Sequence, residues 1–334
     1  MTKGINIRHF SITLLIIVIS ISIIVLDCFS KVKPINYNDE QIARLYVTPP
    51  SDRFSFAVMS DTHSGYTVFN KILTSIDAGH YTFALDIGDI VQYGRKDYFL
   101  TFLNRIKKAK TPFLVGIGNH DLDYQKSARA FSNVFGNTYY AFNYGSSLFI
   151  VLDDSHMNRI DNTQMIWLED LLQKKYNHIF VFMHVPPFDP VNGGNQRLSD
   201  TLNAQAFMSL MEKYKPEIVF TGHRHGYFDE YKKNVHYVIT GGSGEKKWKS
   251  KDELHYFNHY IKVDVMGDKI IKNVVHIPVN SSTFSNYSLL TNIMYYLEGN
   301  KIFAISTIIL LLALFDASVM IIAKFISSFS SHKH

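Results

Sequence analysis

The chain of 334 residues contains a single cysteine, Cys28, so an intrachain disulfide is excluded. Charged residues make up only 19% of the chain, against 46% hydrophobic residues, a balance that allows a buried core and does not favour disorder. The sequence also lacks internal repeats and low-complexity segments. Its net charge of +5 is too small to indicate a nucleic-acid-binding protein, and we expect only a weak attraction for anionic substrates.

Two long apolar stretches frame the chain. Residues 10–26 contain no charged side chain and are just long enough, at roughly 17 residues, for a membrane-spanning helix. A cleaved signal peptide is the alternative, but the apolar part is long for that role and no small-residue cleavage site follows, which favours an uncleaved anchor. Residues 302–326 could instead form a buried soluble helix, but residues 308–315 are apolar on every helical face, which favours a second span.

These stretches predict an integral membrane protein whose central part lies outside the cytoplasm. Basic residues are almost balanced between the tails and the inner flanks, but a short basic tail before the first span is typical of a signal anchor. Cys28 lacks the preceding small residue of a lipoprotein signal, so we interpret it as a cysteine at the membrane edge. Asp316 in the second span is costly in lipid, so it should face a helix, water or a partner, and a hydroxyl of the first span is one candidate.

The predicted domain organisation starts with a tail and anchor over 1–29 and a polar linker over 30–52. A domain of alternating strand-like and helix-like segments follows over 53–280. The chain then continues with a second linker over 281–301, the span over 302–326 and a tail over 327–334. The strand-like runs are short and rich in β-branched and aromatic residues: 54–60, 81–87, 112–117, 147–152, 178–183, 217–221 and 235–240.

Amphipathic spacing predicts helices over 95–110, 162–175 and 199–214. After Gly244 this spacing disappears, and residues 255–265 and 269–279 resemble strands. Because strands and helices alternate and the chain then ends in strands, we expect an α/β layered domain that finishes as sheet.

Five short motifs, in a fixed order, each follow one of the strand-like runs: Asp61-Thr62-His63, Gly88-Asp89, Gly118-Asn119-His120-Asp121, His184 and Gly222-His223-Arg224-His225. Ligands of open α/β sheets bind beyond the carboxyl ends of the strands, so residues far apart in the sequence can meet there. Carboxylate, amide and imidazole groups without thiolate suit manganese, iron or zinc better than calcium. The motifs therefore predict a centre for two divalent metal ions (Mn²⁺, Fe²⁺ or Zn²⁺), which is suited to displacement at phosphorus.

The ordered set of motifs resembles the calcineurin-like metallophosphoesterase superfamily over residues 54–245. This resemblance implies a β-sandwich of two mixed sheets flanked by helices. It also implies two ligand sets that share one carboxylate: Asp61, His63, Asp89 and His225 for one metal, and Asp89, Asn119, His184 and His223 for the other. The first motif is D-x-H, and no tyrosine occupies the ligand position of purple acid phosphatases, which argues against a tyrosinate-bound ferric site.

The resemblance further implies that two cations about 3.5 to 4 Å apart hold a bridging hydroxide that attacks phosphorus in line. His120 would donate a proton or a hydrogen bond to the leaving oxygen, with Asp121 orienting its ring. Candidate substrate contacts are Arg224 between two predicted ligands, Arg197 in the loop after His184, and Lys246 after a glycine turn. For Arg224 a contact with phosphate and exposure to solvent alone both remain open, and a solvated loop is the alternative for Lys246.

We expect a membrane-anchored dimetal phosphoesterase that hydrolyses a phosphodiester or pyrophosphate bond. The head group of a membrane lipid or a lipid-linked precursor is a candidate substrate, because two anchors would hold the site beside it. Alternatives are a nucleotide or cyclic-nucleotide phosphodiesterase and a phosphomonoesterase. A non-catalytic interaction module of the same fold would have lost metal ligands that this chain retains, and a membrane sensor coupled through Asp316 is a further alternative. The sequence predicts no specific nucleic-acid partner.

Overall fold

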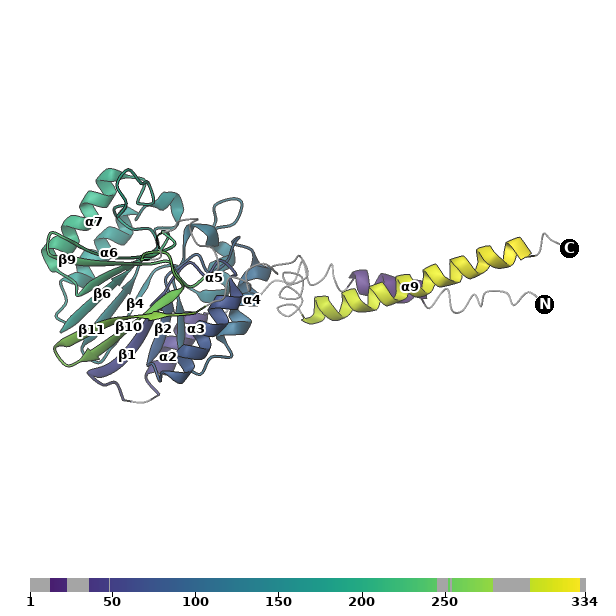
Figure 1. The fold of residues 1–334 in the computed structure, drawn as a ribbon, viewed down its shortest axis with the longest axis horizontal. Coiled ribbons are helices and arrows are strands. Elements are labelled where there is room, and N and C mark those ends of the chain that lie inside the picture. The colour runs from purple at the N-terminus through teal and green to yellow at the C-terminus, as the bar shows by residue number, and fades with distance from the viewer. Residues whose placement is uncertain are drawn as a thin grey trace. The chain divides into compact units, whose positions relative to one another are not determined.

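The computed structural model describes residues 13–22, 36–47, 49–244, 252, 254–278 and 301–330. The chain divides into two compact units, one made of residues 1–32 and 288–334 and the other of residues 33–287. The larger unit has the layered arrangement of sheets and helices shown in Figure 1 and contains all five sequence motifs.

Two mixed β-sheets form the centre of the larger unit. The first sheet has the strand order β11-β10-β1-β2-β3 and the second has the order β4-β5-β6-β7-β9-β8. The strands of the first sheet are β1 (Arg53–Met59), β2 (Phe83–Asp86), β3 (Phe113–Val115), β10 (His259–Met266) and β11 (Lys269–His276). The strands of the second sheet are β4 (Tyr140–Tyr144), β5 (Ser147–Val151), β6 (His178–Phe182), β7 (Ile218–Thr221), β8 (Tyr227–Lys232) and β9 (Val235–Thr240).

The first sheet has parallel strands at one edge and antiparallel strands at the other, and the second sheet has a parallel centre between two antiparallel edges. In the first sheet β1, β2 and β3 are parallel, whereas β10 and β11 are antiparallel additions from the end of the domain. In the second sheet β5, β6, β7 and β9 are parallel, and the outer strands β4 and β8 pair antiparallel. The parallel strands read as continuous apolar runs because both of their faces are covered.

Helices cover the outer faces of the sandwich (Figure 1). The described helices of this unit are α2 (Tyr37–Leu45), α3 (Tyr66–Ala78), α4 (Lys96–Ile106), α5 (Arg129–Phe135), α6 (Asn162–Leu172) and α7 (Thr201–Tyr214). Apolar residues of α6 and α7 form one buried cluster with the outward-facing residues of β5, β6, β7 and β9. On the other side, Phe69 of α3 stacks on Phe102 of α4, with ring centroids 5.0 Å apart, and meets Phe113 of β3 edge-on.

Phenylalanine rings fill the space between the two sheets. Phe56 of β1 stacks on Phe83 of β2 at 5.1 Å and meets Phe149 of β5 edge-on at 5.3 Å. Phe149 in turn stacks on Phe180 of β6. Because alternate residues of a strand share one face, Phe54, Phe56 and Val58 all point into this layer. The aromatic contacts join the two sheets and so fix the edge at which their motif loops meet.

The structure differs from the predicted linker over 30–52, because residues 37–45 form helix α2. The side chain of Asn36 caps this helix by accepting a hydrogen bond from the Asp39 N–H, and Tyr37 and Leu45 are buried. The Asn38 amide pairs with the backbone of Val115 on the edge strand β3, donating to its carbonyl at 2.9 Å and accepting from its N–H at 3.0 Å. The predicted second linker lies almost entirely outside the described residues.

The smaller unit contains a helix over residues 13–22 and α9 (Lys301–Ser330). Within the described residues no helix combines the length and the hydrophobicity that crossing a membrane requires. The predicted span over 10–26 lies partly outside the described residues, and both spans stay predictions.

We expect Asn38→Ala to lower the free energy of unfolding by about 1–3 kcal/mol, because it leaves the buried N–H of Val115 without its partner. Thermal unfolding of the purified chain, followed by circular dichroism, measures this change. Glu40→Ala is the matched control, since Glu40 is an exposed residue of the same helix. Equal midpoints for both variants would show that α2 does not contribute to the stability of the domain.

Candidate metal centre

All five motifs lie in loops that leave the carboxyl ends of parallel strands. Asp61 and His63 follow β1, Asp89 follows β2, and Asn119 and His120 follow β3 in the first sheet. His184 follows β6, and His223 and His225 follow β7 in the second sheet. The two sheets thus direct their motif loops toward one edge of the sandwich, as the sequence predicts.

Four of the predicted ligands have a left-handed backbone conformation, which is uncommon for residues other than glycine. These are Asp61, His63, Asp89 and His223, with φ angles of 64°, 46°, 53° and 63°. Hydrogen bonds between the first two loops hold this geometry, because the Asp61 N–H donates to the carbonyl of Gly88 at 3.0 Å and the His63 N–H donates to that of Asp89 at 2.8 Å. The turns aim several side chains at one point.

Two glycines allow the loops after β2 and β3 to touch. A Cβ atom on Gly118 would lie 2.3 Å from Oδ1 of Asp89, and Gly88, at a φ of 121°, would carry a Cβ 2.6 Å from the N atom of Gly118. Because these two glycines have no side chains, the Asp89 carboxylate fits between the two loops. There its Oδ1 accepts a hydrogen bond of 2.7 Å from the His120 N–H.

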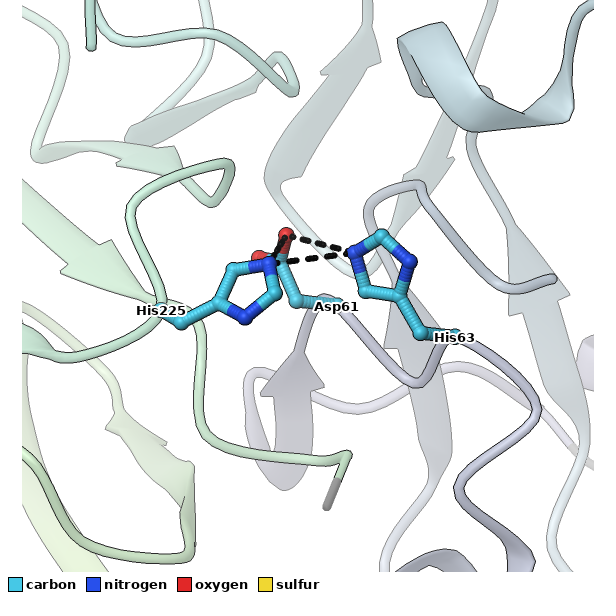
Figure 2. A group of neighbouring side chains, drawn as sticks. All are labelled: Asp61, His63 and His225. Atoms are coloured by element: carbon cyan, nitrogen blue, oxygen red, sulfur yellow. Dashed lines mark hydrogen bonds and ion pairs between the residues drawn. The ribbon is translucent and has the colours of Figure 1, made fainter. Parts of the chain in front are cut away.

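Figure 2 shows the first donor group, which consists of Asp61, His63 and His225. The Nε2 atoms of the two imidazoles lie 3.1 Å apart, and they lie 3.6 and 3.4 Å from Oδ1 of Asp61. The other carboxylate oxygen, Oδ2, accepts a hydrogen bond from the His223 N–H at 2.9 Å. Oδ1 is buried and makes no hydrogen bond within the described residues, as expected of an atom reserved for a cation.

Asp89 joins this group to a second one, formed by Asp89, His184 and His223. Its Oδ2 atom lies 3.3 Å from Nε2 of His63 and 3.1 Å from Nε2 of His184. The Oδ1 atom of Asn119 is buried and makes no hydrogen bond within the described part of the chain. This donor set of carboxylate and amide oxygens with imidazoles fits divalent metals, and the predicted ligands are the residues that would hold them. How the ligands divide between two ions stays a prediction.

The pKa values of the predicted ligands reflect strong attraction between their carboxylates and imidazoles. Burial opposes a charge on His63 and on His184, but the carboxylates of Asp61 and Asp89 outweigh it and raise the pKa of His63 to about 9 and that of His184 to about 10. Burial likewise opposes charge on Asp89, yet the same imidazoles lower its pKa well below the usual range. His223 behaves oppositely, because burial and the nearby His184 lower its pKa to about 4.

The structure assigns the orientation of His120 to a different group from the one expected. Asp121, predicted to orient the imidazole, instead accepts hydrogen bonds from the backbone N–H groups of Ile90, Val91 and Gly118. It thereby holds the loops after β2 and β3, and burial raises its pKa to about 8. Nδ1 of His120 lies 3.2 Å from the carbonyl oxygen of Gln92. A carbonyl can only accept, so Nδ1 carries a proton and Nε2 is left for chemistry.

The three candidate substrate contacts have different surroundings. The Arg224 guanidinium forms a buried ion pair with Asp189 at 3.0 Å and donates to the hydroxyl of Tyr256 at 3.2 Å, so it ties the loop after β6 to the loop before β10. Arg197 is exposed in the loop after His184. Lys246 lies outside the described residues. Contacts of these residues with substrate stay predictions.

Asp154 supports the metal centre, a role that the amino-acid sequence hardly indicates. Its carboxylate accepts hydrogen bonds from the N–H groups of His184 at 3.1 Å and Val185 at 2.7 Å, so it positions the loop that carries His184. Burial raises its pKa to about 7. The pair Asp153-Asp154 follows a predicted strand, as the metal motifs do. This position is the one sequence feature that places Asp154 near the metal centre. A turn or a helix cap is the more common role of such a pair.

Metal binding should release protons near neutral pH. His63 and His184 hold protons below about pH 9 and pH 10, and both must lose them to bind metal, so affinity should rise with pH toward that range. Calorimetric titration of the metal-free chain with Mn²⁺, in buffers of different ionisation enthalpy, counts the protons. We expect release at pH 7.5 and a clear decrease for Asp89→Asn, with His80→Ala as exposed control. Heats that do not depend on the buffer would contradict the charge state described above.

A family model described as Calcineurin-like phosphoesterase matches residues 54–227. Among curated proteins, phosphoenolpyruvate phosphatase of Allium cepa is 24% identical over 223 residues, which cover 58% of this chain and 46% of that protein. The serine/threonine-protein phosphatase CPPED1 of Mus musculus is 28% identical over 162 residues, which cover 42% of this chain and 51% of that protein. The chain thus spans about half the length of these relatives.

Two solved structures share the fold at low sequence identity. The purple acid phosphatase PPD1 of Lupinus luteus superposes with a TM-score of 0.56 at 14% identity, over 69% of this chain and 52% of that one. A dimetal phosphatase of Danio rerio gives a TM-score of 0.53 at 12% identity, over 67% of this chain and 96% of that one. The family match covers more than half of the chain, and the described donor groups come from the matched region. The chain therefore belongs to the family of calcineurin-like phosphoesterases, which are metal-dependent hydrolases of phosphate esters.

Proposed function

We propose that this chain is a membrane-anchored phosphoesterase that uses two metals to hydrolyse a phosphodiester or pyrophosphate bond. The observation that carries the proposal is the position of Asp89, whose single Oδ2 atom lies within 3.3 Å of His63 in one donor group and within 3.1 Å of His184 in the other. A carboxylate shared in this way suits a pair of closely spaced cations.

The chemistry divides between the metals and the side chains around them. Two divalent metals would offset the charge that develops at phosphorus and make a water molecule more acidic. The fixed loops hold the carboxylates and imidazoles in place before substrate binds. His120 donates its Nδ1 proton to the carbonyl of Gln92, so in the doubly protonated form its Nε2–H is the group that can protonate the leaving oxygen when its P–O bond breaks.

The surroundings of Arg224 support a substrate with a single negative charge at phosphorus. A phosphomonoester carries up to two charges there, and an unpaired arginine beside the metals would help to neutralise the second. In this structure the guanidinium of Arg224 already faces Asp189 at 3.0 Å. A diester or an internal pyrophosphate linkage has less charge to neutralise at the reacting phosphorus.

The exposed apolar side chains of the smaller unit support the membrane anchor. Large residues of α9 are well exposed, among them Leu311 at 60%, Leu312 at 65% and Phe315 at 70%. The buried residues among those described in this unit are instead small or polar: Thr13, Ser20, Ser306 and Ala313. Thr13 also donates a hydrogen bond of 3.2 Å to the Asp316 carboxylate. Small residues between helices and apolar residues outside are typical of helices packed in lipid.

The anchor, in turn, favours a substrate that resides in the membrane, such as a lipid head group or a lipid-linked precursor. A site held beside the bilayer meets such substrates at a high local concentration. We place the larger unit on the extracytoplasmic side, on the basis of the short basic tail before the first apolar stretch.

A phosphomonoesterase is the second candidate, because the relatives from onion and mouse are both named phosphatases. Hydrolysis of bis(p-nitrophenyl) phosphate and of p-nitrophenyl phosphate by the Mn²⁺-loaded chain separates the two. A higher kcat/KM for the diester supports the proposal, and a higher value for the monoester supports the alternative. No turnover of either ester together with no metal binding would favour a non-catalytic module.

We expect His120→Ala to lower kcat by about 10²- to 10⁴-fold on a diester with an alkyl leaving group, because that alkoxide must be protonated as it departs. The loss should be much smaller with p-nitrophenolate, which leaves without a proton. Steady-state kinetics on both esters, with metal content measured in parallel, test this difference. An equal loss on the two esters, or a loss of metal, would contradict the assigned role and indicate a ligand instead.

The membrane anchor predicts that the full chain stays in the membrane fraction after extraction with alkaline carbonate, because apolar helices remain in lipid when surface charges are disrupted. Protease added to sealed, right-side-out membrane vesicles should digest the larger unit if it is extracytoplasmic. Complete release of the chain by carbonate would overturn the anchor, and full protection from protease would reverse the orientation.

A further inference from the structure

A cavity of about 430 Å³ opens directly beside the metal centre, on the side of His120. Its walls come from the loop after β2, which contributes Gln92 to Arg95, and from the segment after β3, which contributes Asn119 to Lys126. The cavity therefore shares Asn119 and His120 with the centre. His120, to which proton transfer to the leaving group is assigned, lines this space, whereas none of the predicted metal ligands other than Asn119 does.

Two tyrosines provide the largest side chains of this cavity. The rings of Tyr93 and Tyr124 are nearly parallel, with an interplanar angle of 25° and centroids 6.3 Å apart. Tyr98 of α4 supports Tyr93 by an edge-on contact at 6.1 Å. Tyr93 and Tyr124 are nevertheless 47% and 79% exposed. Because these two rings already face each other, a planar ring would add to the stack on an exposed outer face and would not enter between them.

The backbone is built to bring these tyrosines together. A Cβ atom on Gly94 would lie only 2.2 Å from the carbonyl oxygen of Asp121, so a glycine is needed for the two segments to pack at this distance. On the other side, the Asp123 carboxylate accepts hydrogen bonds from the N–H groups of Gln125 at 2.8 Å and Ser127 at 2.9 Å. These bonds close the turn that presents Tyr124.

Charge alone does not explain the cavity. The guanidinium of Arg95 makes two hydrogen bonds to Asp97, at 3.0 and 3.1 Å, and lies over the ring of Tyr98. Its charge is therefore largely compensated. Lys126 adds one exposed cation at the rim. The exposed tyrosine rings are then the most distinctive feature of the cavity lining.

We propose that Tyr93 and Tyr124 form a leaving-group subsite that stacks a planar heteroaromatic ring, so that the substrate is a phosphodiester whose leaving group is a nucleoside. The inference rests on the proposed hydrolysis at the metal centre and narrows its substrate to a nucleoside ester, in place of the lipid head group considered above. In the reaction the bond from phosphorus to the nucleoside oxygen breaks and water supplies the new oxygen on phosphorus. The nucleoside oxygen takes the Nε2 proton of the doubly protonated His120, and a proton of the attacking water replaces it. A cavity of this volume is within the range of ligand pockets for such a group.

The test measures how the Mn²⁺-loaded full chain, in detergent, hydrolyses two methyl phosphodiesters. Their leaving alcohols, phenol and hexafluoro-2-propanol, have similar acidity, but only phenol is aromatic. Tyr93→Leu and Tyr124→Leu should each raise KM for the phenyl ester about tenfold, with kcat little changed, since stacking is lost equally in the ground state and the transition state. The fluoroalkyl ester should be unaffected. Tyr231→Leu, which removes another exposed tyrosine, on β8, is the control and should change neither ester.

Adenosine and ribose distinguish a nucleoside from any other aromatic group. Adenosine should inhibit competitively, with an inhibition constant that rises about tenfold in the two tyrosine variants, and ribose should not inhibit. Equal effects of the variants on both esters, or no inhibition by adenosine, would overturn the subsite. If the unmodified chain hydrolyses neither ester although it binds metal, the proposed function itself fails, and this outcome is distinct from the others.

Discussion

The attraction between the Asp89 carboxylate and two imidazoles is the interaction on which the rest of the site depends. His63 reaches it from the first sheet and His184 from the second, so the contact spans both layers of the sandwich. The same carboxylate accepts a hydrogen bond from the backbone of His120. One buried charge thus sets the distance between the two donor groups and the position of the residue assigned to the leaving group.

Buried carboxylates at this edge of the sandwich divide into two kinds by the groups that they face. Asp61 and Asp89 face imidazoles and have lowered pKa values, as expected of groups that stay charged to meet cations. Asp121 and Asp154 face backbone N–H groups instead, and burial raises their pKa values to about 8 and about 7. The first pair forms the centre, and the second pair holds the loops that carry His120 and His184.

Much of the fold and most of the site could be predicted, because both leave local signals. The strand over 235–240 has the predicted bounds, and the motif loops follow the strands as expected. The sequence pattern does not indicate helix α2, because its polar composition hides four buried positions that only tertiary packing reveals: Tyr37, Asn38, Gln41 and Leu45. The role of Asp121 was misassigned for a related reason. Whether a carboxylate bonds a ring or a backbone amide depends on loop geometry, which residue spacing does not encode.

The left-handed backbone at four predicted ligands limits how this centre could change its metal preference. Aspartate, asparagine, histidine and glycine tolerate that conformation far better than glutamate, cysteine or β-branched residues do. Asp61, His63, Asp89 and His223 are all of the tolerant types. Replacing one of them with cysteine or glutamate would therefore cost backbone conformational energy, whatever its effect on metal coordination. A variant designed to bind a softer or larger ion would have to alter the turns themselves, and not the side chains alone.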